Sequence, residues 1–172
     1  MYVNVIKYDK RWPQLFQSEA RLLLEVFQEE IMEIHHIGST SVPGLKAKPV
    51  IDIMPVVRSI KRVDALNQSM IKIGYEPLGE NHIPGRRYFR KGGKQRTHHV
   101  HTFQYDNQHA ILRHLAVRDY LRAHPGEAQE YGELKAGLAE AFPEDIYGYM
   151  DGKDEFVKQL EQKALEWKHT KK

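Results

Sequence analysis

The stretch that decides the fold is residues 34–57, which read IHHIGSTSVPGLKAKPVIDIMPVV. Its two ends are apolar, and its middle is rich in glycine, proline and hydroxyl groups. Short apolar runs bounded by such residues are typical of strands, and a nearly continuous apolar run is typical of a strand buried on both faces. The stretch therefore predicts a strand over 34–37, a tight polar turn, and a buried strand over 50–57.

One carboxylate, that of Asp52, interrupts the second apolar run. An ionised carboxylate among apolar side chains is costly unless it is paired or binds a metal. The turn before it contains Gly38, Ser39 and Thr40, whose backbone N–H groups and hydroxyls can hold phosphate oxygens. We therefore predict a phosphate site at this turn and a metal ligand at Asp52. The alternatives are a simple tight connection and a structural carboxylate that caps nearby N–H groups.

The pattern of Gly-Ser, a spacer and an acidic strand resembles the signature of the nucleotidyltransferase superfamily. Residues 36–53, HIGSTSVPGLKAKPVIDI, are similar in particular to the GrpB family. The resemblance covers nearly the whole chain, through shorter matches at residues 8–12, 99–101, 118–122, 131–135 and 153–167. It implies an α+β, nucleotidyltransferase-like fold, in which a mixed β-sheet is packed with helices and further helices follow at the C-terminal end.

The resemblance also implies a parent reaction, the transfer of a nucleotidyl group from an NTP to an acceptor, here a small molecule. That chemistry usually needs two carboxylates, two residues apart on one strand face, to hold paired metal ions. The second position here is Met54, which shares a strand face with Asp52 and is a poor ligand for Mg²⁺. Whether the chain is an enzyme therefore stays open. The alternative is a non-catalytic binder of a nucleotide or phosphorylated metabolite, with a coenzyme A link because GrpB-like domains occur joined to dephospho-coenzyme A kinase.

Two histidines could complete a metal site with Asp52. His99 and His101 lie on one face of a strand predicted over 96–105. The resemblance implies that a strand carrying a third ligand lies beside the strand of Asp52. Two imidazoles and one carboxylate bind a divalent metal, and such a set suits Mn, Fe, Ni or Zn better than Mg. Alternatively, one histidine is a general base, or the two are hydrogen-bonded sheet residues.

Three basic residues are further candidates for phosphate contacts. Lys48 precedes the strand of Asp52, and Arg87 lies in a positive hairpin over 86–105. Arg118 lies in a basic stripe on a helix predicted over 107–123. The alternatives are a solvated edge hairpin, whose charges discourage edge-to-edge pairing, and a solvated helix surface.

The rest of the chain is predicted to be mainly helical. Apolar residues at helical spacing predict helices over 12–32, 59–74, 107–123, 127–142 and 151–167. Residues 75–85 contain two prolines and two glycines and are predicted to be irregular. We expect one domain over residues 1–168 and a disordered tail over residues 169–172.

Composition narrows the class of protein. The chain has 172 residues, no cysteine, and a net charge of +3 from 26 basic and 23 acidic residues. This balance argues against a nucleic-acid partner. The sequence shows no signal peptide and no apolar run long enough for a membrane span, so we expect a cytoplasmic protein.

Overall fold

The computed structural model describes residues 2–171, whose contacts group into two compact units. The sheet unit consists of residues 11–37 and 50–111. The helical unit consists of residues up to 10, residues 38–49 and residues from 112 onwards. The sequence predicts one domain, whereas the contacts between residues divide the chain into these two units.

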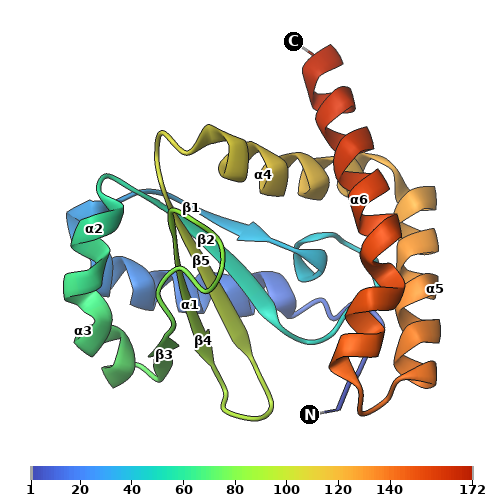
Figure 1. Cartoon of the computed structure of the whole chain (residues 1–172), viewed down its shortest axis with the longest axis horizontal. Coiled ribbons are helices and arrows are strands. Elements are labelled where there is room, and N and C mark those ends of the chain that lie inside the picture. Colours follow the sequence, from blue (N-terminus) through green and yellow to red (C-terminus); the bar gives the residue numbers. More distant parts are fainter. Residues whose placement is uncertain (1, 172) are drawn as a thin grey trace. The chain divides into compact units, whose positions relative to one another are not determined.

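A five-stranded mixed sheet forms the centre of the sheet unit (Figure 1). Its strands are β1 (Ile31–Ile37), β2 (Ile51–Val57), β3 (Tyr75–Pro77), β4 (Arg86–Lys91) and β5 (His98–Gln104), in the order β1-β2-β5-β4-β3. β2 and β5 are parallel, whereas the other neighbours are antiparallel. The sheet confirms the predicted α+β class and the hairpin formed by β4 and β5.

The helices of the sheet unit cover one face of this sheet. They are α1 (Trp12–Phe27), α2 (Ile60–Val63) and α3 (Asn67–Lys72). The ring of Phe16 on α1 stacks on His36 of β1, with centroids 4.8 Å apart. His36 pairs with Ile53, and side chains alternate along a strand, so Asp52 faces the opposite side of the sheet.

Some predicted helix ends in this unit are wrong. The first helix ends at Phe27 instead of residue 32, because Gln28 has a φ of 52° and cannot continue it. The second is divided by a 3-10 turn, Asp64–Leu66, into α2 and α3. Residues 75–77, predicted to be irregular, form β3 through pairing with β4.

The helical unit contains α5 (Pro125–Ala141), α6 (Ile146–Thr170) and most of α4 (Gln108–Ala123). α5 and α6 run side by side in Figure 1. They approach closely at Gly152, where an added Cβ would lie 2.3 Å from a methyl group of Leu138. A cluster of buried residues joins these helices to the turn region: Val42, Leu45, Ala116, Tyr120, Leu121, Ala128, Tyr131, Leu160 and Ala164.

α6 is longer than predicted at both ends. It begins at Ile146 because Asp145 caps it, accepting a hydrogen bond from the Gly148 N–H. It continues to Thr170, whose hydroxyl donates to the carbonyl of Trp167. Residues 169 and 170 are therefore helical instead of disordered, and residue 172 lies outside the described residues. Across residues 2–171, no helix has the length and apolar character needed to cross a membrane.

Candidate functional site

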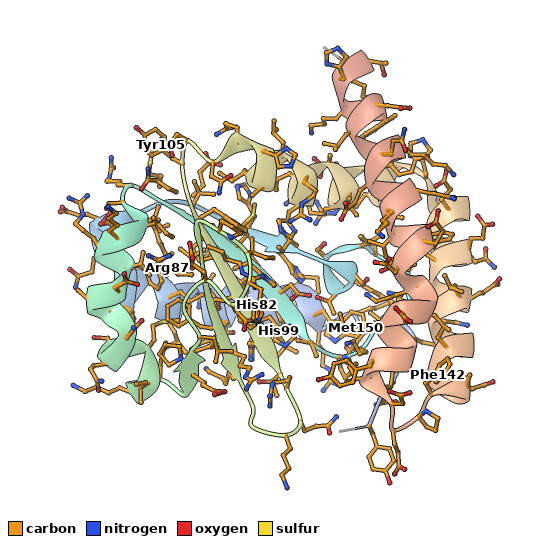
Figure 2. The ribbon with its side chains drawn as sticks, viewed as in Figure 1. His82, Arg87, His99, Tyr105, Phe142 and Met150 are labelled. Atoms are coloured by element: carbon orange, nitrogen blue, oxygen red, sulfur yellow. The ribbon has the colours of Figure 1, made fainter. Side chains whose placement is uncertain are left out.

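The sheet unit brings Asp52, His99 and His101 together on one face. β2 and β5 are adjacent, and Asp52 lies opposite His99 in their register. Oδ1 of Asp52 is 3.0 Å from Nε2 of His101 and 3.4 Å from Nδ1 of His99. Figure 2 labels His99 on β5. The strand pairing implied by the family resemblance is therefore present.

The carboxylate of Asp52 is held in its ionised form. Burial acts to raise its pKa, but hydrogen bonds from His101 and His99 outweigh burial and hold the pKa of Asp52 well below its usual range. One ligand atom from each of the three residues lies within 4.8 Å of the others. Because two ligands of one ion are at most about 4.2 Å apart, a slight closure lets these residues fit a single divalent ion. Met54 is fully buried and adds no hard ligand.

Sequence reasoning missed two residues beside this cluster, Tyr88 and Arg86 on β4. The Tyr88 ring lies 5.3 Å from that of His101 and 5.7 Å from that of His99. Burial, together with the charge of Asp52, raises the pKa of Tyr88, so its phenol stays protonated. The Arg86 guanidinium lies 4.6 Å from the Tyr88 ring centre. Strand alternation predicts that Arg86 and Tyr88 share one face of β4, but that this face carries the histidines follows only from the register between β4 and β5.

The predicted phosphate turn forms part of a small cavity in the helical unit. Gly38 has a φ of 73°, and the 3-10 turn Ser39–Ser41 follows it. The cavity has a volume of about 110 Å³, and Gly38, Ser39 and Arg118 line it, together with residues of α5 and α6. Thr40 is buried within the same turn.

A buried lysine, Lys135 on α5, holds this turn. Its side chain is 2% exposed, and its Nζ donates a hydrogen bond of 2.8 Å to Oγ of Ser39. The same Nζ lies 4.4 Å from the centre of the Tyr131 ring. An ammonium group next to glycine N–H groups and a serine hydroxyl is suited to an anion. The sequence pointed to Lys135 only through the family resemblance.

The other basic candidates have different surroundings. Arg118 lines the cavity and donates a hydrogen bond to Asp119. Burial acts to raise the pKa of Asp119, but hydrogen bonds from Lys168 and Arg118 outweigh burial and lower it. Arg87, labelled in Figure 2, points away from the histidines and donates to Asp64 at 2.7 Å. The Nζ of Lys48 lies 5.2 Å from the ring centre of Tyr149. Only Arg118 of these three belongs to the cavity.

Comparison with known proteins places the chain in a family. The model of the family described as GrpB protein matches residues 2–163. Protein YqkA of Bacillus subtilis is 51% identical over 166 residues, which cover 96% of this chain and 48% of YqkA. The chain thus spans about half the length of that relative. The glutamate-rich protein GrpB of Alkalihalophilus pseudofirmus is 34% identical, over 92% of this chain and 93% of that protein.

Solved structures support the same assignment. A crystal structure of GrpB from Enterococcus faecalis is 48% identical, covers 95% of this chain and 98% of that one, and has a TM-score of 0.93. A cytoplasmic RNA terminal U-transferase shares the fold, with 12% identity over 76% of this chain and 42% of that one, and a TM-score of 0.52. By sequence alone, a dephospho-CoA kinase of Mycobacterium tuberculosis is 24% identical over 95% of this chain and 46% of the kinase. The chain therefore belongs to the GrpB family and has a nucleotidyltransferase-like fold.

Proposed function

We propose that the chain transfers a nucleotidyl group from an NTP to a small molecule, with one divalent metal ion held in the sheet unit. The observation that carries this proposal is the Asp52 carboxylate set between the imidazoles of His99 and His101. A bound ion would supply Lewis-acid stabilisation of negative charge on a phosphoryl oxygen. The two nitrogen ligands favour Mn²⁺ or Zn²⁺ over Mg²⁺.

A candidate phosphate site lies entirely within the helical unit. The cavity is lined by Ser39, whose hydroxyl is oriented by Lys135, and by Arg118. Lysine and arginine neutralise phosphate charge, and a small cavity excludes competing water. Lys48 lies over the ring of Tyr149 and Arg87 donates to Asp64, so neither is among the groups of this site.

A second candidate function is non-catalytic binding of a nucleotide or phosphorylated metabolite. Met54 supports it, because a methionine replaces the second carboxylate of the two-metal mechanism. The similarity to dephospho-CoA kinase makes a coenzyme A precursor a candidate ligand.

Restoring the missing acid separates the two functions. We would measure release of pyrophosphate from NTP with Mn²⁺, Zn²⁺ or Mg²⁺ in the wild type, Met54→Asp and Asp52→Ala, with a panel of small acceptors. Turnover in the wild type that disappears in Asp52→Ala supports the enzyme. Turnover that appears only in Met54→Asp supports the binder.

We expect Lys135→Met to weaken ATP binding about tenfold or more, because a charge-assisted hydrogen bond contributes about 1.5–3 kcal/mol. Methionine keeps much of the side-chain volume, so the helix packing is retained. Calorimetric titration with ATP measures the change. Lys163→Met is the matched control, since Lys163 is an exposed lysine of the same unit. If Lys135→Met and Lys163→Met bind ATP with equal affinity, Lys135 does not contribute to phosphate binding.

A further inference from the structure

The buried side chain of Arg86 connects the candidate metal ligands, Asp52, His99 and His101, to the loop that precedes β4. It is 7% exposed. Its Nε donates to the carbonyl of Glu80 at 3.3 Å, and its Nη2 donates to the carbonyl of Asn81 at 3.0 Å. Its Nη1 lies 3.4 Å from Nδ1 of His101. One planar group therefore contacts both the loop and a proposed metal ligand.

The contact with His101 defines where that imidazole carries its proton. A guanidinium has only N–H donors, so Nδ1 of His101 must accept. In the neutral ring the proton is then on Nε2, where it is donated to Oδ1 of Asp52 at 3.0 Å. Both ring nitrogens of His101 then have a partner, Arg86 at Nδ1 and Asp52 at Nε2.

Metal binding requires the opposite arrangement. To bind an ion through Nε2, His101 must offer the lone pair of Nε2 and carry its proton on Nδ1. An Nδ1–H would point at an N–H of Arg86, where a metal-binding histidine normally has an acceptor. The contact between Arg86 and Nδ1 and ligation through Nε2 therefore exclude each other.

We propose that Arg86 is a positioning residue that couples occupancy of the Asp52, His99 and His101 site to the loop over residues 79–85. The inference rests on the metal site of the proposed function. When His101 binds an ion, Arg86 moves away from Nδ1. Because the guanidinium is a rigid fork, its bonds to the carbonyls of Glu80 and Asn81 are lost with the same movement.

The loop has a backbone that depends on such anchors. Asn81 and His82 have φ angles of 46° and 72°, a conformation that non-glycine residues rarely adopt. Such residues persist where surrounding contacts hold them. The contacts here include the two Arg86 bonds and a hydrogen bond of 2.7 Å from the Gly85 N–H to the Glu80 carboxylate. Backbone N–H groups of Ile83 and Tyr88 also donate to the carbonyls of Glu80 and Gly79. Release of Arg86 is expected to let the exposed segment with His82, labelled in Figure 2, relax.

The first test is nitrogen NMR of the histidine rings in chelator-treated protein, with the His101 signals assigned by their absence in His101→Asn. We expect the Nε2–H tautomer without metal, and a metal-bound Nε2 with a protonated Nδ1 after addition of Zn²⁺. Hydrogen exchange at amides 79–85 should rise about fivefold or more with Zn²⁺, as for local opening. An Nδ1–H tautomer in the metal-free protein would overturn the proposal.

Two Arg86 variants and one control variant make the test specific. Arg86→Met should bind Zn²⁺ about tenfold more tightly, a typical outer-contact effect on metal affinity, and its loop exchange should not respond to metal. Arg86→Lys keeps the charge but not the fork, so its loop should exchange quickly with or without metal. Arg62→Met, which removes another arginine of the sheet unit, paired with Glu30, should behave as the wild type.

The outcomes separate this inference from the proposed function. Zn²⁺ binding that leaves loop exchange unchanged in the wild type overturns the coupling and leaves the metal site in place. A wild type that binds neither Zn²⁺ nor Mn²⁺ overturns the metal site and the coupling together.

Discussion

Replacing Asp52 by alanine is expected to weaken binding of Mn²⁺ and Zn²⁺ by at least about 100-fold, the upper end of what losing an outer contact of a metal site costs. The reason is that Asp52 is the anionic member of the cluster and lies next to both imidazoles. Two neutral imidazoles alone cannot offset the cost of dehydrating the ion. Calorimetric titration of chelator-treated protein with Mn²⁺, Zn²⁺ and Mg²⁺ measures the loss.

The matched control is Asp64→Ala, which removes another aspartate of the sheet unit that pairs with Arg87. It should bind metal as the wild type does, whereas a His99→Ala, His101→Ala double variant should lose binding. Because the pKa of Asp52 is held below its usual range, its carboxylate stays ionised in mildly acidic buffer. Protonation of Asp52 therefore does not weaken metal binding as the pH is lowered towards 5. If Asp52→Ala binds Mn²⁺ and Zn²⁺ as tightly as the wild type, Asp52 is not a metal ligand and its role is structural.

The central part of the fold was predictable because its signals are local. The apolar run over residues 50–57 and the polar turn before it specify a buried strand after a bend. The glycine pair after Lys91 specifies a hairpin between β4 and β5. The pairing of β2 with β5 is not local, and only the family resemblance implied it.

Which arginine lies near the site could not be read from local signals. Arg86 and Arg87 are adjacent, so they lie on opposite faces of β4. The choice between them depends on which face the helices cover, and that is a tertiary property. The positive hairpin pattern pointed to Arg87, whereas the structure places Arg86 next to His101 and Arg87 next to Asp64.

Long-range contacts also explain why Lys135 was missed. In sequence it is one polar residue on a helix, and its partner Ser39 lies 96 positions earlier. Some predicted helix ends were wrong because the spacing of apolar residues indicates which face of a helix is buried but not the residue at which the helix ends. The positive φ of Gln28 ends α1, although apolar spacing continues beyond it.

A second buried polar group that the sequence did not reveal is Glu19 on α1, on the helix-covered face of the sheet. It is 7% exposed and accepts hydrogen bonds from the Tyr75 hydroxyl, at 2.7 Å, and from the Lys91 ammonium. Nε2 of His98 lies 3.7 Å from its other oxygen. Burial acts to raise the pKa of Glu19, but the bonds from Lys91 and Tyr75 outweigh it, and the pKa is lowered.

We expect Glu19→Ala to lower the free energy of unfolding by about 3 kcal/mol, because it leaves the Lys91 ammonium and the Tyr75 hydroxyl without their partner. Glu19→Gln, which keeps the volume, should cost about half as much, and Glu25→Ala, at an exposed position of α1, should cost less than about 0.5 kcal/mol. Urea unfolding measures all three. Since the folded pKa is lowered from 4.5, the stabilisation is present above that pH and is lost as the pH falls through the folded value. The difference between the wild type and Glu19→Gln should therefore shrink in acid, and a difference that is constant from pH 7 to pH 3 would show that the charge of Glu19 does not stabilise the sheet unit.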